Sequence, residues 1–527
     1  MKVKNINKVL LVSIIIFGAL IRVVLLPLPG NSSDVATFVR FADQVLKFGP
    51  QSLYEPTDLG QVQGHFTYPP LFPMILAGSF WVERAILRLL WQPSEAAFGA
   101  ASSQLDDLVV KGWAVAGDAF LAWFAWREVC RFQGQRSATV VVAAILWSPA
   151  IAYAGAYWGQ IDALLAAVVV AAVSSMLNRQ WWLVGAWVSV GMLLKPQMVV
   201  AVPIVVLGTV ILGRLGGAVR AGCASLGVGA MLTLPFWATG RFGVLASAYL
   251  HAAGAYPAVT VNADNIWTAL CSLPLGLSCG SDSELLVWGL TYRQVGLLCL
   301  SVYVTFVLFL LARPFMILSE IDRKISSNIE LENNAREIVF VGMSLVFFAF
   351  FMLPTQVHER YLLPAIALMS ILVNYNKEYR IIYSILSFNF LLNLISVVTI
   401  SATISRSIQS LGFTPQNISW INCIVFVIML FDYIENLREK AFEKQSKMHG
   451  NSHMQWILSA TMCVSIISIE SQVFMNLSMF LTENTSIWII ITCAGIVFIR
   501  LWFLLLEGLR NIIVSSTSAL STIKPEI

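Results

Sequence analysis

Charge is what this sequence most lacks. Lysine, arginine, aspartate and glutamate make up 12% of the 527 residues, against about 25% in soluble proteins. With 58% hydrophobic residues and a mean hydropathy of +0.76, the chain cannot cover a water-facing surface. This excludes a soluble enzyme and a disordered chain. Because apolar runs recur from residue 9 to residue 506, it also excludes a large soluble domain on a single anchor.

Several other patterns are missing. There is no polybasic or aromatic-basic tract, so we expect no nucleic-acid partner. The eight cysteines form no CxxC pair, which argues against a structural zinc site. There is no DxD motif and no cluster of acids, so we expect no metal and no bound cofactor. For Cys271 and Cys279, a disulfide in an oxidising compartment and two unrelated small residues both remain open.

The apolar runs themselves indicate membrane helices. Most are 14 to 27 residues long and continuously apolar, whereas a β-barrel shows segments of about ten alternating residues. The N-terminal run is longer than the apolar core of a signal peptide, so we expect a retained first helix. The sequence therefore predicts an all-α polytopic membrane protein with about fourteen transmembrane helices. The predicted spans are 9–29, 109–126, 138–156, 161–177, 181–194, 198–213, 222–238, 285–311, 338–354, 361–375, 381–401, 418–435, 455–475 and 486–506.

Loop charges predict the orientation of these spans. With the N-terminus inside, 21 of the 33 lysines and arginines fall in cytoplasmic segments and 8 in external ones, as the positive-inside rule requires. Segment 69–90 carries Glu83, Arg84 and Arg88, which are costly in lipid. We therefore expect it to be a juxtamembrane amphipathic helix within a long first external loop, 30–108. Both termini are then cytoplasmic.

Polar residues gather in five of the seven predicted external connections. The first loop holds Asp34 and Tyr68-Pro69-Pro70. The later ones are YWGQID with Asp162, LLKPQ with Lys195 and Gln197, AYPAVTVNADNIW with Asn262 and Asp264, and PTQVHERYLLP with His358, Glu359 and Arg360. Because all of them face the same side, we expect them to form one site beside the membrane.

Structural interpretations of the acids and prolines stay open. Ser32 or Ser33 can cap a helix that starts near Asp34, whose charge suits a helix N-terminus; alternatively, Asp34 is a general base. Tyr68-Pro69-Pro70 can simply begin a helix. Asp162 suits the start of a crossing. The short span 181–194 should stop at Lys195-Pro196.

Three potential cations, Lys195, His358 and Arg360, could together hold a phosphate diester at membrane depth. The alternatives are that Lys195 snorkels to the interface and that Arg360 pairs with Glu359 or Asp162. Tryptophans 147, 158, 181, 182 and 237 lie near span ends, and an aromatic belt accounts for them.

The ordered set of an early acid, YPPL, WGQID, LLKPQ, YP…VNADNIW and QVHERYLLP resembles the GT-C glycosyltransferases. It looks most like the dolichyl-phosphate-glucose-dependent glucosyltransferases and their bacterial relatives, and it is similar to polyprenol-phosphate-mannose-dependent mannosyltransferases. The resemblance covers about 9–375. The glucosyltransferase branch has an acid before YPPL, where this chain has Thr67, so the sugar stays open.

The resemblance implies a GT-C fold with juxtamembrane helices in the first external loop. It implies inverting transfer of a hexose from a polyprenyl-phosphate carrier to an acceptor hydroxyl, with Asp34 as catalytic base. The matching motifs place Tyr68, the Lys195-Pro196-Gln197 segment and the His358-Glu359-Arg360 segment at the donor phosphate and substrate. Asp162, Asn262 and Asp264 complete the predicted substrate site.

The composition changes near residue 315, where alanine, glycine and tryptophan give way to isoleucine, serine and asparagine. We expect a catalytic module at 1–311, and a C-terminal module at 312–527 that completes the donor site at 354–361. The expected partners are the lipid bilayer, a polyprenyl-phosphate-linked sugar and a glycan or glycolipid acceptor. Short loops favour a bacterial plasma membrane with the site facing outside. A lipid or sugar transporter or flippase, and a polymerase or ligase of lipid-linked glycans, are the alternatives.

Overall fold

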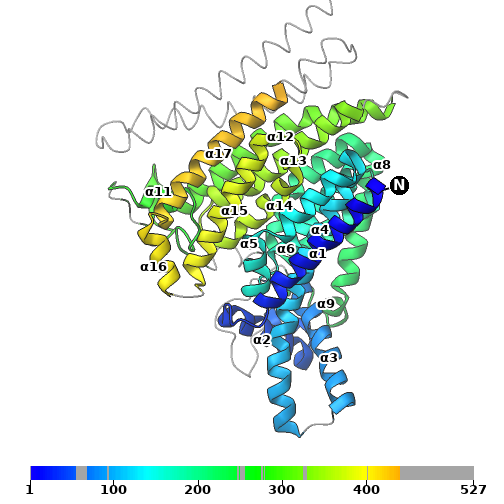
Figure 1. The fold of residues 1–527 in the computed structure, drawn as a ribbon, viewed down its shortest axis with the longest axis vertical. Coiled ribbons are helices and arrows are strands. Elements are labelled where there is room, and N and C mark those ends of the chain that lie inside the picture. Colours follow the sequence, from blue (N-terminus) through cyan, green and yellow to red (C-terminus); the bar gives the residue numbers. More distant parts are fainter. Residues whose placement is uncertain are drawn as a thin grey trace, which may run out of the picture.

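A computed structural model describes residues 2–54, 68–91, 94–245, 249, 256–274, 277, 279–323, 329–399 and 402–438. The described chain is a helical bundle with one short β-hairpin (Figure 1). The helices are α1 (Lys2–Leu25), α2 (Ser32–Phe48), α3 (Leu71–Trp91), α4 (Glu95–Leu146), α5 (Pro149–Ala152), α6 (Asp162–Leu177), α7 (Trp181–Leu194), α8 (Val202–Leu232), α9 (Leu234–Ala238), α11 (Ile266–Cys271), α12 (Tyr292–Arg323), α13 (Ile329–Met352), α14 (Leu363–Leu372), α15 (Lys377–Val397), α16 (Ala402–Ser410) and α17 (Pro415–Leu437). Short 3₁₀ or π turns are η1 (Pro50–Tyr54), η2 (Tyr153–Tyr157), η3 (Pro196–Val200) and η4 (Glu359–Leu362), and the strands are β1 (Leu285–Val287) and β2 (Leu290–Thr291).

The length and composition of these helices confirm an all-α polytopic membrane protein. Seven described helices are long and apolar enough to cross a membrane, or eight if the bent pair 149–157 and 162–177 is one span. Two of them, α4 and α8, are interrupted by Gly134 and Arg214, whose backbone angles are not helical. Each interruption falls between two predicted spans. The predicted spans 455–475 and 486–506 lie outside the described residues.

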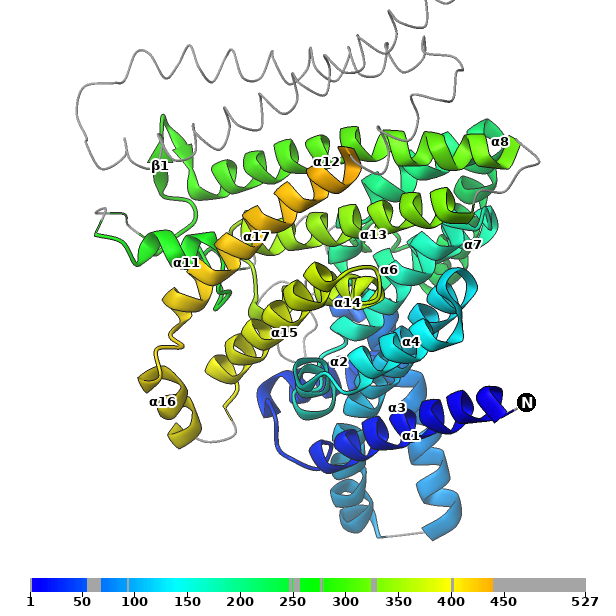
Figure 2. The same cartoon turned by 45° about the horizontal axis from the view of Figure 1, so that its top comes forward.

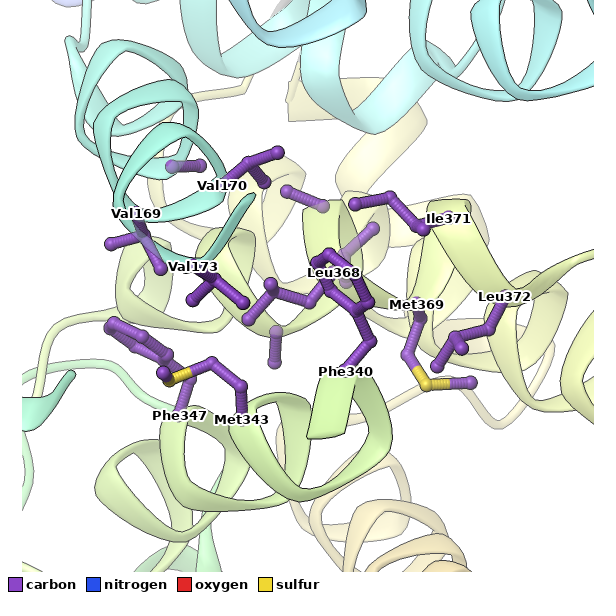
Figure 3. Close-up of a cluster of buried hydrophobic side chains, with 14 of the residues drawn as sticks. Val169, Val170, Val173, Phe340, Met343, Phe347, Leu368, Met369, Ile371 and Leu372 are labelled. Carbon is purple, nitrogen blue, oxygen red and sulfur yellow. The ribbon is translucent and has the colours of Figure 1, made fainter. Parts of the chain in front are cut away.

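The centre of the bundle is apolar and is built by α6, α13 and α14. Figure 3 shows valines of α6 meeting Phe340, Met343 and Phe347 of α13 and Leu368 of α14. All of these side chains are at most 4% exposed. The helix α13, whose apolar window is 94% buried, is therefore an internal helix of the bundle (Figure 2).

Local sequence signals set several helix ends as expected. Helix α7 stops at Leu194, directly before Lys195-Pro196, and α6 starts at Asp162. Between η2 and α6 the chain bends by 119°. This bend brings the WGQID turn to the end of the bundle that also holds Lys195.

Segment 69–90 forms the helix α3, which is not among the helices apolar enough to cross. Arg84 of α3 binds Asp43 of α2 at 2.8 Å and Asp106 of α4 at 2.9 Å. Arg84, one of the three charges that argued against a lipid-facing span, thus joins three helices to one another.

Candidate active site

Asp34 lies in the first turn of α2, and its carboxylate reaches a distant part of the chain. Trp158 Nε1 and Gln160 Nε2 donate to its Oδ2 at 2.9 and 2.7 Å. No hydrogen bond from a described residue reaches Oδ1. Two donors on one oxygen fix the orientation of the carboxylate. The predicted helix is present, but its cap is Asn31, whose side chain accepts from the Asp34 amide, and not Ser32 or Ser33.

A turn that requires glycine presents these two donors. It follows the π-helical η2, a distortion common at functional sites. Gly159 has φ +90°, and a Cβ there would meet Val35 Cγ2 at 3.0 Å. Only glycine adopts this conformation without strain. Trp158 is 1% exposed, so its indole serves Asp34 and the aromatic-belt prediction is wrong for it.

The aromatic-belt prediction also fails for Trp181, which is 8% exposed and buried in the bundle. Trp147, Trp182 and Trp237 are exposed, as a belt requires.

Asp162 and Lys195 form a fully buried ion pair. Lys195 Nζ lies 2.7 Å from Asp162 Oδ1, and both side chains are 1% exposed. Snorkelling therefore does not describe Lys195, because its ammonium stays inside the protein. The Tyr68 ring lies 5.8 Å from the same Nζ.

Arg360 extends this pair into a cluster. Its Nη1 binds Glu359 Oε1 at 3.0 Å, and its Nε lies 3.9 Å from Asp162 Oδ2. The ion pairs weighed as the structural alternative from the sequence are therefore both present. They place residues from the WGQID, LLKPQ and QVHERYLLP segments within one continuous network.

His358 is part of the cluster but is uncharged. Burial, followed by the charges of Arg360 and Lys195, lowers the pKa of His358 to about 2. His358 therefore does not supply one of the three positive charges that the sequence predicted. The imidazole Nδ1 lies 3.5 Å from Arg360 Nη1.

Tyr68 lies close to both Asp34 and the Lys195–Arg360 cluster. Burial raises the pKa of Tyr68, and Arg360, Asp162 and Asp34 all act on its hydroxyl electrostatically. Its ring packs edge-on against Phe38 of α2 at 5.5 Å. The YPP segment directly precedes α3, as the structural interpretation predicted, and it also lines the site.

Asn262 reaches the site through its backbone, and Asp264 through its carboxyl group. Asn262 pairs with His358 as an isolated β-bridge and has φ +62°, a conformation that asparagine tolerates better than most residues. Asp264 is 1% exposed. Burial, and then Glu359, raise its pKa to about 8, so the carboxyl is neutral at pH 7.

Several buried polar atoms lack a hydrogen-bond partner, either in the cluster or within two residues of it in the sequence. They are Gln160 Oε1, Asp162 Oδ2, Gln197 Oε1, Asp264 Oδ2 and Arg360 Nε. Buried polar groups are nearly always hydrogen-bonded in proteins, so a concentration of free acceptors and one free donor favours a polar ligand here. Within the described ranges, no three His, Cys, Asp or Glu side chains are grouped so that they could hold a metal ion.

A second loop braces the QVHER segment. Cys271 and Cys279 are joined by a disulfide, one of the two alternatives left open by the sequence. Asp282 is completely buried and accepts hydrogen bonds from Arg293, Thr355 and Gln356. Hydrogen bonds to the charged form hold the pKa of Asp282 below its usual range.

Sequence reasoning missed Asp282 and the two donors to Asp34. Trp158 and Gln160 lie inside a quoted motif, but only Asp162 was predicted there as a site residue, and Trp158 was assigned to an aromatic belt. For Asp282 no local signal exists, since its partners come from other parts of the chain.

Comparison with known proteins adds one solved structure. No protein-family model matches the chain, and no curated protein matches it. The chain is similar to a crystal structure of ArnT from Cupriavidus metallidurans bound to undecaprenyl phosphate, with a TM-score of 0.42 and 12% identity over 82% of this chain and 78% of that one.

Proposed function

We propose that this chain is an integral-membrane, inverting glycosyltransferase. It moves a hexose from a polyprenyl-phosphate donor to an acceptor hydroxyl on the external face. The observation that carries the proposal is the Asp34 carboxylate, fixed through Oδ2 by Trp158 and Gln160. Tyr68 links this carboxylate to the buried cluster of Asp162, Lys195 and Arg360, because its hydroxyl interacts electrostatically with Asp34 as well as with Asp162 and Arg360.

The geometry suits this chemistry. The acceptor hydroxyl gives its proton to Asp34 as its oxygen bonds the anomeric carbon. The bond from that carbon to the phosphate oxygen breaks, and its electron pair leaves with the phosphate. Negative charge therefore grows on the phosphate, where donors placed in advance stabilise it. Arg360 Nε, buried and without a hydrogen-bond partner, is such a donor.

The free acceptors suit the sugar. Gln160 uses its amide nitrogen on Asp34, so its unpaired Oε1 accepts from a ligand. Asp162 Oδ2 and Gln197 Oε1 are also unpaired acceptors. Acceptors left over in this way match the hydroxyl hydrogens of a hexose.

The test is transfer by purified protein from synthetic polyprenyl-phosphate hexoses, with a panel of glycan and glycolipid acceptors. Asp34→Asn keeps the shape of the side chain but removes the base, so transfer should fall by about 10² to 10⁴-fold. Asp43→Asn is the matched control, because Asp43 is a partly exposed acid on the same helix that pairs with Arg84.

Transfer by Asp34→Asn at the wild-type rate would remove Asp34 from the mechanism. Flux across proteoliposomes without chemical change would support a transporter instead. Use of an oligosaccharide-diphosphate donor would support a polymerase or ligase.

A further inference from the structure

Three asparagines lie inside the membrane helices of the C-terminal part, where no motif was recognised. They are Asn389 and Asn393 of α15 and Asn422 of α17, and they are 3%, 2% and 1% exposed. Polar side chains within membrane helices are expensive and tend to mark function. Asparagines at such positions also hydrogen-bond across helices.

These side chains bind the backbone of the loop beside the site. Asn393 Nδ2 donates to the Asn262 carbonyl at 2.8 Å, and its Oδ1 accepts from the Asp264 amide at 3.3 Å. Asn422 Nδ2 donates to the Asp264 carbonyl at 2.8 Å. The bond of Asn389 does not reach the loop, because its Nδ2 donates to Asn422 Oδ1 at 2.9 Å.

The same loop holds His358. The Val261 amide donates to the Val357 carbonyl at 3.1 Å, and both Val261 and Asn262 form bridges with His358. Figure 2 shows α17 next to α11, the helix that follows this loop, and α15 packs against α17. A continuous chain of hydrogen bonds therefore runs from α17 and α15, through residues 262–264, to the segment that carries Glu359 and Arg360.

The loop also fixes an acid that has a free oxygen. Asp264 Oδ2 is buried without a hydrogen-bond partner, and Glu359 contributes to the raised pKa of about 8. Burial of this carboxyl is unfavourable, so something must hold the loop in place. The three bonds that Asn393 and Asn422 make to the loop backbone are suited to this, because buried polar networks that are fully satisfied are rigid.

We propose that Asn393 and Asn422 are positioning residues, which clamp residues 262–264 from the C-terminal helices and thereby set the place of His358 and Asp264 in the site. The inference rests on the proposed function, and it assigns a role in activity to α15 and α17. It predicts that loss of the clamp changes catalysis without changing any residue that touches the substrate.

The test compares Asn393→Leu, Asn422→Leu and Asn389→Leu in the full-length protein. Leucine has a similar shape and lacks hydrogen-bonding groups. Asn389→Leu is the matched control, because it lies one turn from Asn393, is equally buried and has no bond to the loop. We expect kcat/KM for the donor to fall about tenfold or more in Asn393→Leu, because small displacements of catalytic groups are costly. The loss should be smaller in Asn422→Leu and smallest in Asn389→Leu.

Two further readouts separate positioning from general damage. Hydrogen exchange of residues 261–265 should rise in Asn393→Leu and not in Asn389→Leu, and the Tm of these two variants should be similar. The exchange result does not depend on turnover, so it tests the clamp even if the proposed reaction fails. Unchanged exchange in Asn393→Leu, faster exchange with unchanged kcat and KM, or equal loss of activity in all three variants would overturn the proposal.

Discussion

Two buried charge clusters lie at opposite ends of α6 and differ in one respect. Near its C-terminal end, Arg336 Nη1 binds Glu128 at 2.9 Å, and the same guanidinium binds Glu332, the Leu177 carbonyl and Asn178. None of its nitrogens is unpaired. At the N-terminal end, the Asp162–Lys195 pair adjoins Arg360. Neither Asp162 Oδ2 nor Arg360 Nε has a hydrogen-bond partner, although the two atoms lie 3.9 Å from each other.

The difference teaches how to separate structural from functional charge. Arg336 and Glu128 are 3% and 4% exposed, and Lys195 and Asp162 are 1% exposed, so burial does not distinguish the clusters. Hydrogen-bond satisfaction does, because unpaired buried donors and acceptors cost free energy unless a ligand completes them. This difference supports the proposal that the Arg360 cluster binds a ligand and that the Arg336 cluster is structural.

The largest effect on stability is expected from Lys195→Met. This change leaves Asp162 buried opposite no ammonium group, and breaking a buried pair costs about 3–5 kcal/mol. Adding Asp162→Asn should recover much of the thermal stability, which thermal unfolding in detergent measures. Transfer should not recover, because the two charges of the site are lost together. A double variant with restored activity would make this pair structural too.

Replacing each arginine by lysine compares the two clusters directly. Arg336→Lys keeps the charge but cannot make all bonds to Glu332, Leu177 and Asn178, so stability should fall by about 1–3 kcal/mol. Its kcat per folded molecule should stay at the wild-type value. Arg360→Lys should show the reverse, with kcat/KM reduced about tenfold or more and little change in Tm. The same pattern in both variants would contradict the comparison.

The smallest effect is a pH dependence from Asp264. Its pKa rises from 3.8 to about 8 on folding, so between these values the folded chain holds a proton that the unfolded chain releases. Its contribution to stability therefore falls as pH rises through this range. Asp264→Asn removes this loss, so the Tm difference from wild type should be greater at pH 9 than at pH 5, by about 2 °C or more. A difference independent of pH would show that Asp264 is charged in the fold.

Prediction from the sequence succeeded where the signal is local. The end of α7 follows from Lys195-Pro196, because proline cannot continue a helix. The charges of α3 correctly argued against a lipid-facing span, although Arg84 turned out to join helices. The sequence also predicted that the polar residues of the external connections gather together, and the structure brings Asp162, Lys195 and Arg360 into one network.

Prediction failed where a property depends on surroundings. The charge state of His358 follows from burial beside Arg360 and Lys195, and no residue next to it in sequence indicates that burial. Ser32 or Ser33 was predicted to cap α2, but Asn31 does so. Several neighbouring residues could cap this helix, and the backbone conformation decides which of them does.

The sequence by itself determined that this protein lies in a membrane and where several of its helices run. Both depend on short stretches of sequence, because apolar runs favour lipid and proline ends a helix. Only the tertiary structure decided which side chains bond to one another. It joined Asp34 to Trp158 and Gln160, more than a hundred residues away, and Asn393 to Asn262. Those pairings depend on which helices pack together, and packing is a property of the whole bundle that no local pattern contains.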